Sequence, residues 1–378
     1  MLKPLKKLNA WLHLWLGLAS GIVVIILGIT GCILVFEQEI RSLSSPWLHV
    51  EMPAKGTYLP PSELYKEVKK ALPEKEIRSV WYHGANRTAH FSINDSDSMV
   101  YVNPYTAKIV AMVDHEDFFH EIDEGHRHLW LPPNIGRPIV GWATFIFFIL
   151  LVTGLILWWP KNLKKSNIEK SFKVKWRAKF KRVNYDLHNV LGFYSMLLAL
   201  LMAITGLIMS FSWFNKGVYW LTGGDNNQSK PKEELFEPSK LPMLGQVDKV
   251  WRKVQDEIAV DNKDQIIVSF PDHDDDPIYA CTDMVNGHWR DLYFKQTDLS
   301  LTNSTKAKMA DLPLADKVRK LNYTLHVGAF AGLFSKTIYF LASLICASLP
   351  ITGFYIWWGK RKKSKKKSHK LKRTQLSA

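Results

Sequence analysis

The chain has 378 residues, 47% of them apolar, with a mean hydropathy of −0.10 and a net charge of +15. Taken as averages, these values describe a soluble basic protein, and an evenly basic surface would suggest nucleic acid as a partner. The charge is uneven, however: residues 1–10, 160–186 and 359–378 together carry +21, whereas residues 37–137 and 213–336 carry −6. Long uncharged apolar runs separate the two groups. The composition therefore indicates a membrane protein, and its basic excess requires no nucleic acid.

Four apolar runs are long enough to cross a bilayer as helices. A hydrocarbon core of roughly 30 Å needs about 20 residues at about 1.5 Å per residue. None of the runs contains Asp, Glu, Lys or Arg. The predicted spans are residues 11–36, 139–159, 187–211 and 337–358.

The basic segments between these spans fix the expected topology. Residues 1–10, the loop 160–186 and the tail 359–378 fall on one side if the helices alternate, and the positive-inside rule makes that side the cytoplasm. Both termini are then cytoplasmic, and the segments 37–138 and 212–336 form two domains outside. The basic tail is also expected to contact anionic membrane lipid.

The two outer segments have α+β patterns. Residues 61–72 and 244–258 show a helical period, whereas residues 79–93 and 266–270 are rich in β-branched and aromatic residues. Residues 100–110 read as a strand, a proline turn and a return strand. The fold class predicted is four transmembrane helices with two α+β extracytoplasmic domains.

The spans contain an internal repeat. A Thr-Gly pair lies near the C-terminal end of all four. His13 precedes Thr30 by 17 residues, and His188 precedes Thr205 by 17. The second and fourth spans also match each other from their Thr-Gly pairs to a Trp-Trp pair. The architecture is therefore predicted to be helix, outer domain, helix, repeated once.

Histidines occupy duplicated positions at the ends of the spans, where ionisable residues are candidates for a functional site. His13 and His188 lie just inside the cytoplasmic boundary. His326 lies shortly before the fourth span, and His126 and His128 take the corresponding place before the second. Their depth sorts them into an inner pair and an outer pair.

Paired imidazoles facing each other across a helix bundle are typical of bis-histidine ligation of haem iron. The chain has no Cys-x-x-Cys-His motif, so a bound haem would be non-covalent and b-type. A single such histidine would more simply be an interfacial side chain that reaches toward water. Four at repeated positions favour ligands, and two histidines without nearby cysteine or carboxylate are incomplete as a zinc site.

The motifs resemble one known family. Trp11-Leu-His-Leu-Trp-Leu-Gly-Leu, Tyr185-Asp-Leu-His-Asn-Val-Leu-Gly-Phe-Tyr and Leu325-His-Val-Gly with its distal Thr352-Gly-Phe-Tyr-Ile-Trp-Trp are similar to the PepSY-associated transmembrane helix family of bacterial inner-membrane proteins. Val100-Tyr-Val-Asn-Pro-Tyr-Thr resembles the PepSY strand-turn. The resemblance covers nearly the whole chain.

This resemblance implies a di-haem ferric-siderophore reductase, with two haem b groups. His13 and His188 would ligate the inner haem, and His326 with an outer histidine the second. The family pattern Leu-His-Arg-x-Leu favours His126 as that outer ligand, with His128 as the alternative, although Gly125 stands where the family has Leu. The implied substrate is a ferric siderophore outside the inner membrane, and the electron donor stays unidentified.

Two other functions are compatible with the sequence. One is a non-redox module whose outer domains bind or regulate envelope proteins, and the other is an accessory transporter of the iron chelate. The outer histidines also raise a geometrical question, since they precede their apolar runs by about eleven residues. Pro132-Pro133 would allow the chain to fold back there, and Arg127 and Arg137 are candidates to neutralise haem propionates.

Overall fold

A computed structural model describes residues 3–54, 56–160, 162, 164–225, 236–285 and 287–375. The chain divides into two compact units. The first, the helix bundle, comprises Met1–Phe36, Glu121–Asn215 and Asn322–Ala378. The second, the sheet unit, comprises Glu37–His120 and Lys216–Leu321.

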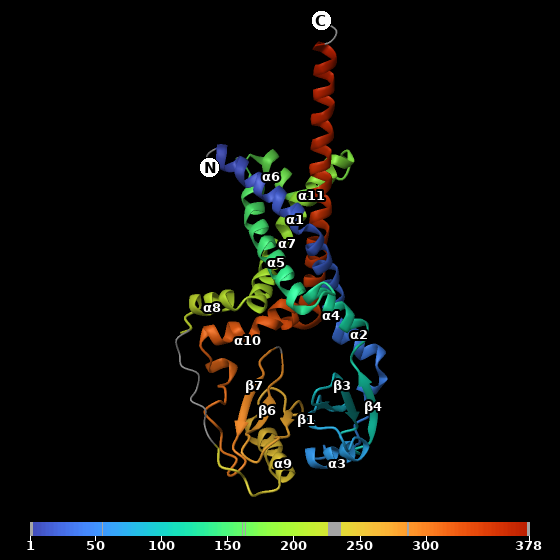
Figure 1. Ribbon diagram of the computed structural model, residues 1–378, viewed down its shortest axis with the longest axis vertical. Coiled ribbons are helices and arrows are strands. Elements are labelled where there is room, and N and C mark those ends of the chain that lie inside the picture. The colour runs from blue at the N-terminus through green and yellow to red at the C-terminus, as the bar shows by residue number, and fades with distance from the viewer. Residues whose placement is uncertain are drawn as a thin grey trace. The chain divides into compact units, whose positions relative to one another are not determined.

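Four long helices form the bundle: α1 (Lys3–Leu34), α5 (Pro133–Trp158), α7 (Phe180–Ser210) and α11 (Gly332–Gln375) (Figure 1). Each contains a segment long and apolar enough to cross a membrane. α1 and α7 each pack against both α5 and α11, so the four helices close a ring around one interior. The four predicted spans are therefore helices, and every helix begins several residues before its predicted span.

Small residues let the helices of the bundle approach closely. A Cβ atom on Gly28 of α1 would lie 2.8 Å from the Cβ of Ala347 on α11, and one on Gly21 would lie 3.1 Å from Pro350. In a membrane, where lipid is as apolar as the side chains, such close packing is a main source of helix association. The middle of the bundle is filled by a cluster of buried residues, Leu151, Ala199, Ala203 and Cys346.

The described residues of the sheet unit form an antiparallel sheet of seven strands in the order β4-β3-β2-β1-β5-β6-β7. Two helices, α3 (Pro61–Ala71) and α9 (Met243–Lys253), contact each other and lie on the same face of the sheet (Figure 1). The strands are β1 (Ile77–Trp81), β2 (Ala89–Ile93), β3 (Ser98–Val102), β4 (Ile109–Asp114), β5 (Ile267–Ser269), β6 (Ile278–Thr282) and β7 (Arg290–Phe294).

The two outer segments form one unit, which differs from the two separate domains expected. β1 of the first segment pairs with β5 of the second, with Val80 opposite Val268. Both residues belong to one buried cluster that also contains Leu64 of α3 and Val250 of α9. Separation would expose this core and an unpaired edge on each half, which explains why the halves join.

Local elements follow the sequence patterns with one clear difference. The helical pattern of residues 61–72 corresponds to α3, and that of 244–258 corresponds to α9 followed by a π turn. The strand-like residues 79–93 are instead parts of two strands, β1 and β2, which pair as a hairpin. The remaining helices are α2 (Glu37–Ser44), α4 (Phe118–His128), α6 (Lys165–Phe172), α8 (Ser212–Leu221) and α10 (Leu314–Val327), with short 3₁₀ turns at Pro46–Leu48, Met309–Asp311 and Ala329–Ala331.

The basic tail continues the last helix. α11 extends through the basic residues to Gln375, well past the predicted end of the span at residue 358. The run of Lys and Arg has high helix propensity, and no Gly or Pro follows Gly359 to end the helix. Residues 226–235, inside the second predicted outer domain, lie outside the part of the chain that the structure describes.

Candidate functional site: two histidine pairs

The inner pair consists of His13 on α1 and His188 on α7. The two imidazole rings face each other across the bundle with their centroids 6.4 Å apart and their planes at 86°. The two helices do not neighbour each other in the ring of four, so the pair spans the interior. The structure thus brings together the two histidines that the sequence placed at one depth.

The outer pair consists of His126 near the end of α4 and His326 near the end of α10. Their ring centroids are 6.2 Å apart, with the planes at 66°. Both histidines precede a long helix of the bundle, α5 and α11 respectively. The outer pair therefore has nearly the same spacing as the inner pair.

Each of the four rings is hydrogen-bonded through Nδ1 to the threonine of a Thr-Gly pair on a neighbouring helix. Each threonine hydroxyl also donates to the carbonyl four residues earlier in its own helix, at 2.7–3.1 Å. Since its hydrogen is used there, Oγ1 accepts from the ring, which puts the proton on Nδ1. The pairs are His13–Thr153 (3.0 Å), His126–Thr30 (2.8 Å), His188–Thr352 (2.9 Å) and His326–Thr205 (2.9 Å).

A carbonyl group supports the same tautomer. The carbonyl oxygen of Leu349, three residues before Thr352, lies 3.1 Å from Nδ1 of His188. A carbonyl can only accept, so Nδ1 must carry the proton and Nε2 keeps its lone pair. Nε2 is therefore the nitrogen available to bind a metal.

The glycine of each Thr-Gly pair lies against the histidine ring. A Cβ atom on Gly154 would lie 3.2 Å from Cε1 of His13, and one on Gly353 would lie 3.3 Å from Cε1 of His188, so both inner positions are tight. At Gly206 and Gly31 the corresponding distances to the outer histidines are 3.4 and 3.5 Å, which is ordinary van der Waals contact. In each Thr-Gly pair the threonine therefore orients the ring, and at the inner pair the glycine also gives it space.

Three asparagines, which were not predicted from the sequence, complete this arrangement. Asn184 lies one turn before His188, and its Nδ2 donates to the backbone carbonyl of Thr352 at 3.0 Å. Asn9 and Asn322 do the same for Thr153 and Thr205, at 3.1 and 3.2 Å. The sequence contains the spacing Asn-x-x-x-His at three of these four histidines, and this repeat could have indicated the contacts. His126 has Ile122 at that position, so its site lacks this contact.

His128, the alternative outer residue, does not face His326. Its Nδ1 donates to Glu124 at 2.9 Å, and its Nε2 accepts from Nε of Arg137 at 2.9 Å. With both nitrogens engaged, its buried ring ties α4 to α5. Arg137 is thus bonded to His128, and Arg127 forms an ion pair with Asp123 at 2.9 Å.

A tight corner returns His126 to the bundle. α4 ends at His128, and Leu129 and Trp130 then adopt left-handed φ values of 58° and 56° before α5 begins at Pro133. A Cβ on Gly136 would lie 2.0 Å from the carbonyl oxygen of His128, so only glycine fits there. The fold-back suggested by Pro132-Pro133 is present, and it answers the question of how His126 reaches Thr30.

Gly125 has a packing role at the same corner. The Trp130 ring lies against it, so closely that a Cβ on Gly125 would lie 2.2 Å from the ring. The indole Nε1 donates to the carbonyl of Glu121 at 2.7 Å. Where the family pattern has Leu, this chain therefore has a glycine that is covered by the ring of Trp130.

The corner before α11 uses glycine instead. Gly328 follows α10 with φ of +71°, and a Cβ there would overlap the ring of Tyr339 at 2.5 Å. Ser335 donates its hydroxyl to the Gly328 carbonyl at 2.6 Å. Gly328 and Gly332, which has φ of +59°, thus serve the turn that positions His326.

The two pairs define the chemistry that the bundle can support. Each pair brings two imidazole rings, both with an unprotonated Nε2, to within 6.2–6.4 Å of each other, a suitable arrangement for two protein ligands of one metal centre. Within the described part of the chain, no group of three or more His, Cys, Asp or Glu residues could hold a metal ion.

The helix bundle and its histidine pairs define a multi-pass membrane protein with two candidate cofactor positions. The chain belongs to the PepSY-associated TM region family, whose sequence model matches residues 10–360. No curated protein matches the sequence significantly.

Proposed function

We propose that the protein is a b-type di-haem oxidoreductase that reduces a ferric siderophore outside the bacterial inner membrane. The observation that carries the proposal is the fourfold Nδ1–threonine contact, which leaves Nε2 unprotonated on both rings of each histidine pair. His13 and His188 would hold the inner haem, and His126 and His326 the outer one. A haem carries one electron at a time between ferrous and ferric iron.

The spacing of the pairs supports this cofactor. A metal–imidazole bond is about 2 Å long, so two imidazoles on opposite sides of one metal have centroids about 6 Å apart. The observed separations are 6.4 and 6.2 Å. His13 with His188, and His126 with His326, would each supply two ligands, a number that fits a haem because its macrocycle would bring the others.

The residues of the bundle have defined tasks in this proposal. The four threonines fix the ring tautomer and orientation, a contact of the type that tunes metal affinity in other proteins. The asparagines hold three of those threonines in place. Buried apolar residues between the two pairs, including Leu151 and Ala203, keep water from the interior.

The substrate class follows from ligand hardness. Siderophores with oxygen donors bind the small, hard Fe(III) much better than Fe(II), because hard donors prefer the more highly charged ion. Addition of one electron to the chelated iron therefore releases it without chemical attack on the chelator. The protein needs no nucleophile and no acid–base pair for this reaction.

The proposed orientation rests on the basic segments. Both termini and the loop 160–186 would be cytoplasmic, and the sheet unit periplasmic, with helix and outer segment each occurring twice. The outer histidine pair is then on the periplasmic side, because Thr30 and Thr205 lie near the ends of α1 and α7 from which the chain enters the sheet unit.

An anaerobic assay tests the function. The purified protein, reduced with dithionite and freed of excess reductant, is mixed with a ferric hydroxamate siderophore and a chromogenic Fe(II) chelator. We expect Fe(II) to form as the haem spectrum reoxidises, and the His326→Ala variant to lose this activity. Bound siderophore without Fe(II) formation would favour a transport role, and neither binding nor haem would favour the non-redox module.

A further inference from the structure

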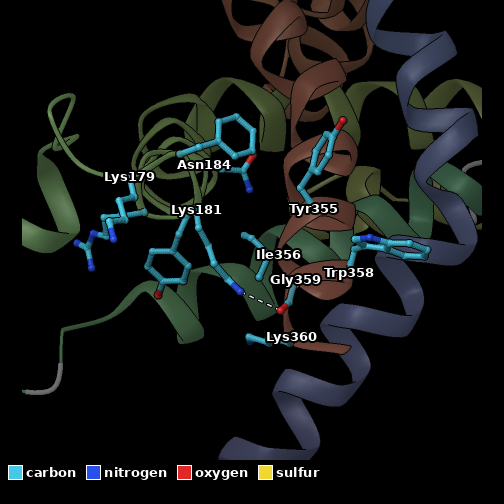
Figure 2. Close-up of a pocket in the computed structure, with 11 residues that line it drawn as sticks. Lys179, Lys181, Asn184, Tyr355, Ile356, Trp358, Gly359 and Lys360 are labelled. Atoms are coloured by element: carbon cyan, nitrogen blue, oxygen red, sulfur yellow. Dashed lines mark hydrogen bonds between the residues drawn. The ribbon is translucent and has the colours of Figure 1, made fainter. Parts of the chain in front are cut away.

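A groove on the surface of the helix bundle lies near the inner histidine pair. It has a volume of about 600 Å³ and is lined by residues at the start of α7 and by the segment of α11 around Tyr355 (Figure 2). Both segments belong to the helix bundle, on the side that carries the basic loop and tail. The groove therefore lies where the predicted cytoplasmic membrane interface meets the two helices.

The lining combines aromatic and cationic side chains. Phe180, Tyr185, Tyr355 and Trp358 supply aromatic surface, and each is 44–70% exposed. The cations of the lining are Lys179, Lys181, Arg182 and Lys360, and none of the described residues that line the groove is acidic.

Lys181 defines one end of the groove. Its Nζ donates to the carbonyl of Gly359 at 2.8 Å, which joins α7 to α11, as the dashed line in Figure 2 shows. Arg182 is paired with Asp186, which lies outside the lining, at 2.8 Å. The groove thus offers positive charge next to an apolar and aromatic surface.

A residue in the wall of the groove is hydrogen-bonded directly to Thr352, the residue that orients the ring of His188. Asn184 lines the groove, and its Nδ2 donates to the carbonyl of Thr352. The hydroxyl oxygen of Thr352 in turn accepts a hydrogen bond from Nδ1 of His188. Asn184 of α7 and Thr352 of α11 would therefore be the residues that connect a ligand in the groove to His188 of the inner pair.

We infer that this groove binds the headgroup of a membrane quinol, which supplies the electrons at the inner histidine pair. The inference rests on the proposed function. Oxidation of one quinol to the quinone releases two electrons and two protons. His13 and His188 would hold the one-electron carrier that takes these electrons singly, and the protons would leave to water on the basic side.

The lining matches the chemistry of a quinol. The neutral quinol is an aromatic diol that dissolves in lipid, and the exposed aromatic rings offer faces for it to stack on. Loss of a proton gives the quinolate anion, which the surrounding lysines stabilise and which is a stronger reductant than the neutral form. An electrically neutral, purely apolar groove would not stabilise the quinolate anion.

Two variants and a matched control test the site in the full-length haem-loaded protein in phosphatidylcholine nanodiscs. Ile356→Trp fills the groove, and Lys181→Met removes its bridging cation. Lys173→Met removes an exposed cation that does not line the groove. The measurements are the rate of haem reduction by decylubiquinol, the rate with dithionite, the haem content, and the peptides labelled by a photoreactive azidoquinone.

The inference predicts that both groove variants slow reduction by decylubiquinol about tenfold, the equivalent of one charge-assisted hydrogen bond. Their haem content and reduction by dithionite should match those of the control, and the azidoquinone should label the peptides that contain Tyr185 and Tyr355. An unchanged quinol rate, a loss of haem from the variants, or label displaced by anionic phosphatidylglycerol would each overturn it. Absence of haem from the wild type would refute the proposed function instead, and the azidoquinone would still test the groove.

Discussion

If the inner pair binds haem as proposed, removal of the Thr352 hydroxyl should weaken that binding without disturbing the fold. In Thr352→Val the ring of His188 loses the oxygen that orients Nδ1 at 2.9 Å, although the volume of the side chain is unchanged. Loss of such a supporting contact costs about 10–100-fold in metal affinity. Haem titration of the apoprotein measures this, with Thr337→Val as control, since that hydroxyl bonds only within α11. Equal affinity in both variants would show that the threonine has no orienting role.

A stacked histidine pair in the sheet unit gives a pH-dependent stability. Nε2 of His83 lies 2.8 Å from Nδ1 of His90, and the rings stack at 4.9 Å. Burial, with a smaller contribution from Arg87, lowers the pKa of His83 to about 4. Burial, reinforced by the neighbouring His83 and His115, lowers the pKa of His90 to about 3. Both rings are therefore neutral in the folded protein above these values.

Below pH 6.5 these two histidines bind protons in the unfolded chain but stay neutral in the folded protein. The free energy of unfolding should therefore fall as the pH falls. The loss is about 1.4 kcal/mol per pH unit for one histidine, between pH 6.5 and its folded pKa. The melting temperature of the wild type should be lower at pH 5 than at pH 7. The control His273→Gln, which changes an exposed ring, should show the same difference, and His90→Gln should show a smaller one. The same pH dependence in all three proteins would contradict this assignment.

At the scale of residues, the sequence predicted the histidines better than their partners. The 17-residue spacing of His13 from Thr30 showed that the two residue types repeat together. It did not show that each histidine bonds to the threonine of another helix, because sequence spacing carries no information on which helices are neighbours. The asparagines could have been found from their fixed spacing to three of the histidines.

At the scale of elements, the α4–α5 corner decides which outer histidine enters the pair. Gly136 contacts the carbonyl of His128 so closely that a methyl group cannot fit, because its Cβ would lie 2.0 Å from that oxygen. Gly136→Ala should therefore shift α4 and reduce haem at the outer pair while the inner pair keeps its own. The control is Gly217→Ala, where a Cβ meets no atom within 4 Å. Haem content and the electron paramagnetic resonance of each haem distinguish the two sites.

This corner explains why the sequence left His126 and His128 as alternatives. The two residues are separated by one position, so they point to different faces of α4. The choice between them depends on the left-handed conformations of Leu129 and Trp130, which neither residue type favours. The buried contacts of His128 with Glu124 and Arg137 hold the corner in that conformation.

At the scale of the whole molecule, the sheet unit should unfold as one body although its strands come from two distant segments. Leu64 of α3 is fully buried in the core shared by both halves. Leu64→Ala should lower the free energy of unfolding by about 2–5 kcal/mol. Hydrogen exchange should accelerate in β2 and β6 together, whereas Leu43→Ala, at a residue 90% exposed, should change neither. Faster exchange in β2 alone would mean that the halves unfold independently.

The sequence predicted the helices, the α+β class and the repeat of histidine motifs, but it could not predict the single sheet. Pairing of β1 with β5 joins residues nearly 190 positions apart, and the short β5 has only three residues, Ile267–Ser269. Such a pairing is set by the shared core of α3 and α9, which no local pattern reveals. The shared sheet also means that the two repeats fold together.

The two histidine pairs occupy opposite ends of the bundle. His13 and Thr30 are 17 residues apart on α1, which corresponds to about 25 Å along the helix. The interior between them contains buried Leu151, Ala199 and Cys346, with Phe147 and Phe148 packed against this cluster. In the proposed function, electrons cross this apolar segment between the two pairs.

The haem-to-protein ratio in single and double histidine variants tests the central claim most directly. The account predicts a b-type spectrum with two haems per wild-type chain and one in His13→Ala, in His188→Ala and in their double variant. His13→Ala combined with His326→Ala should retain none, because that change breaks both pairs. A wild-type protein without a b-type band, or a His13→Ala/His188→Ala variant with no haem at all, would contradict the account.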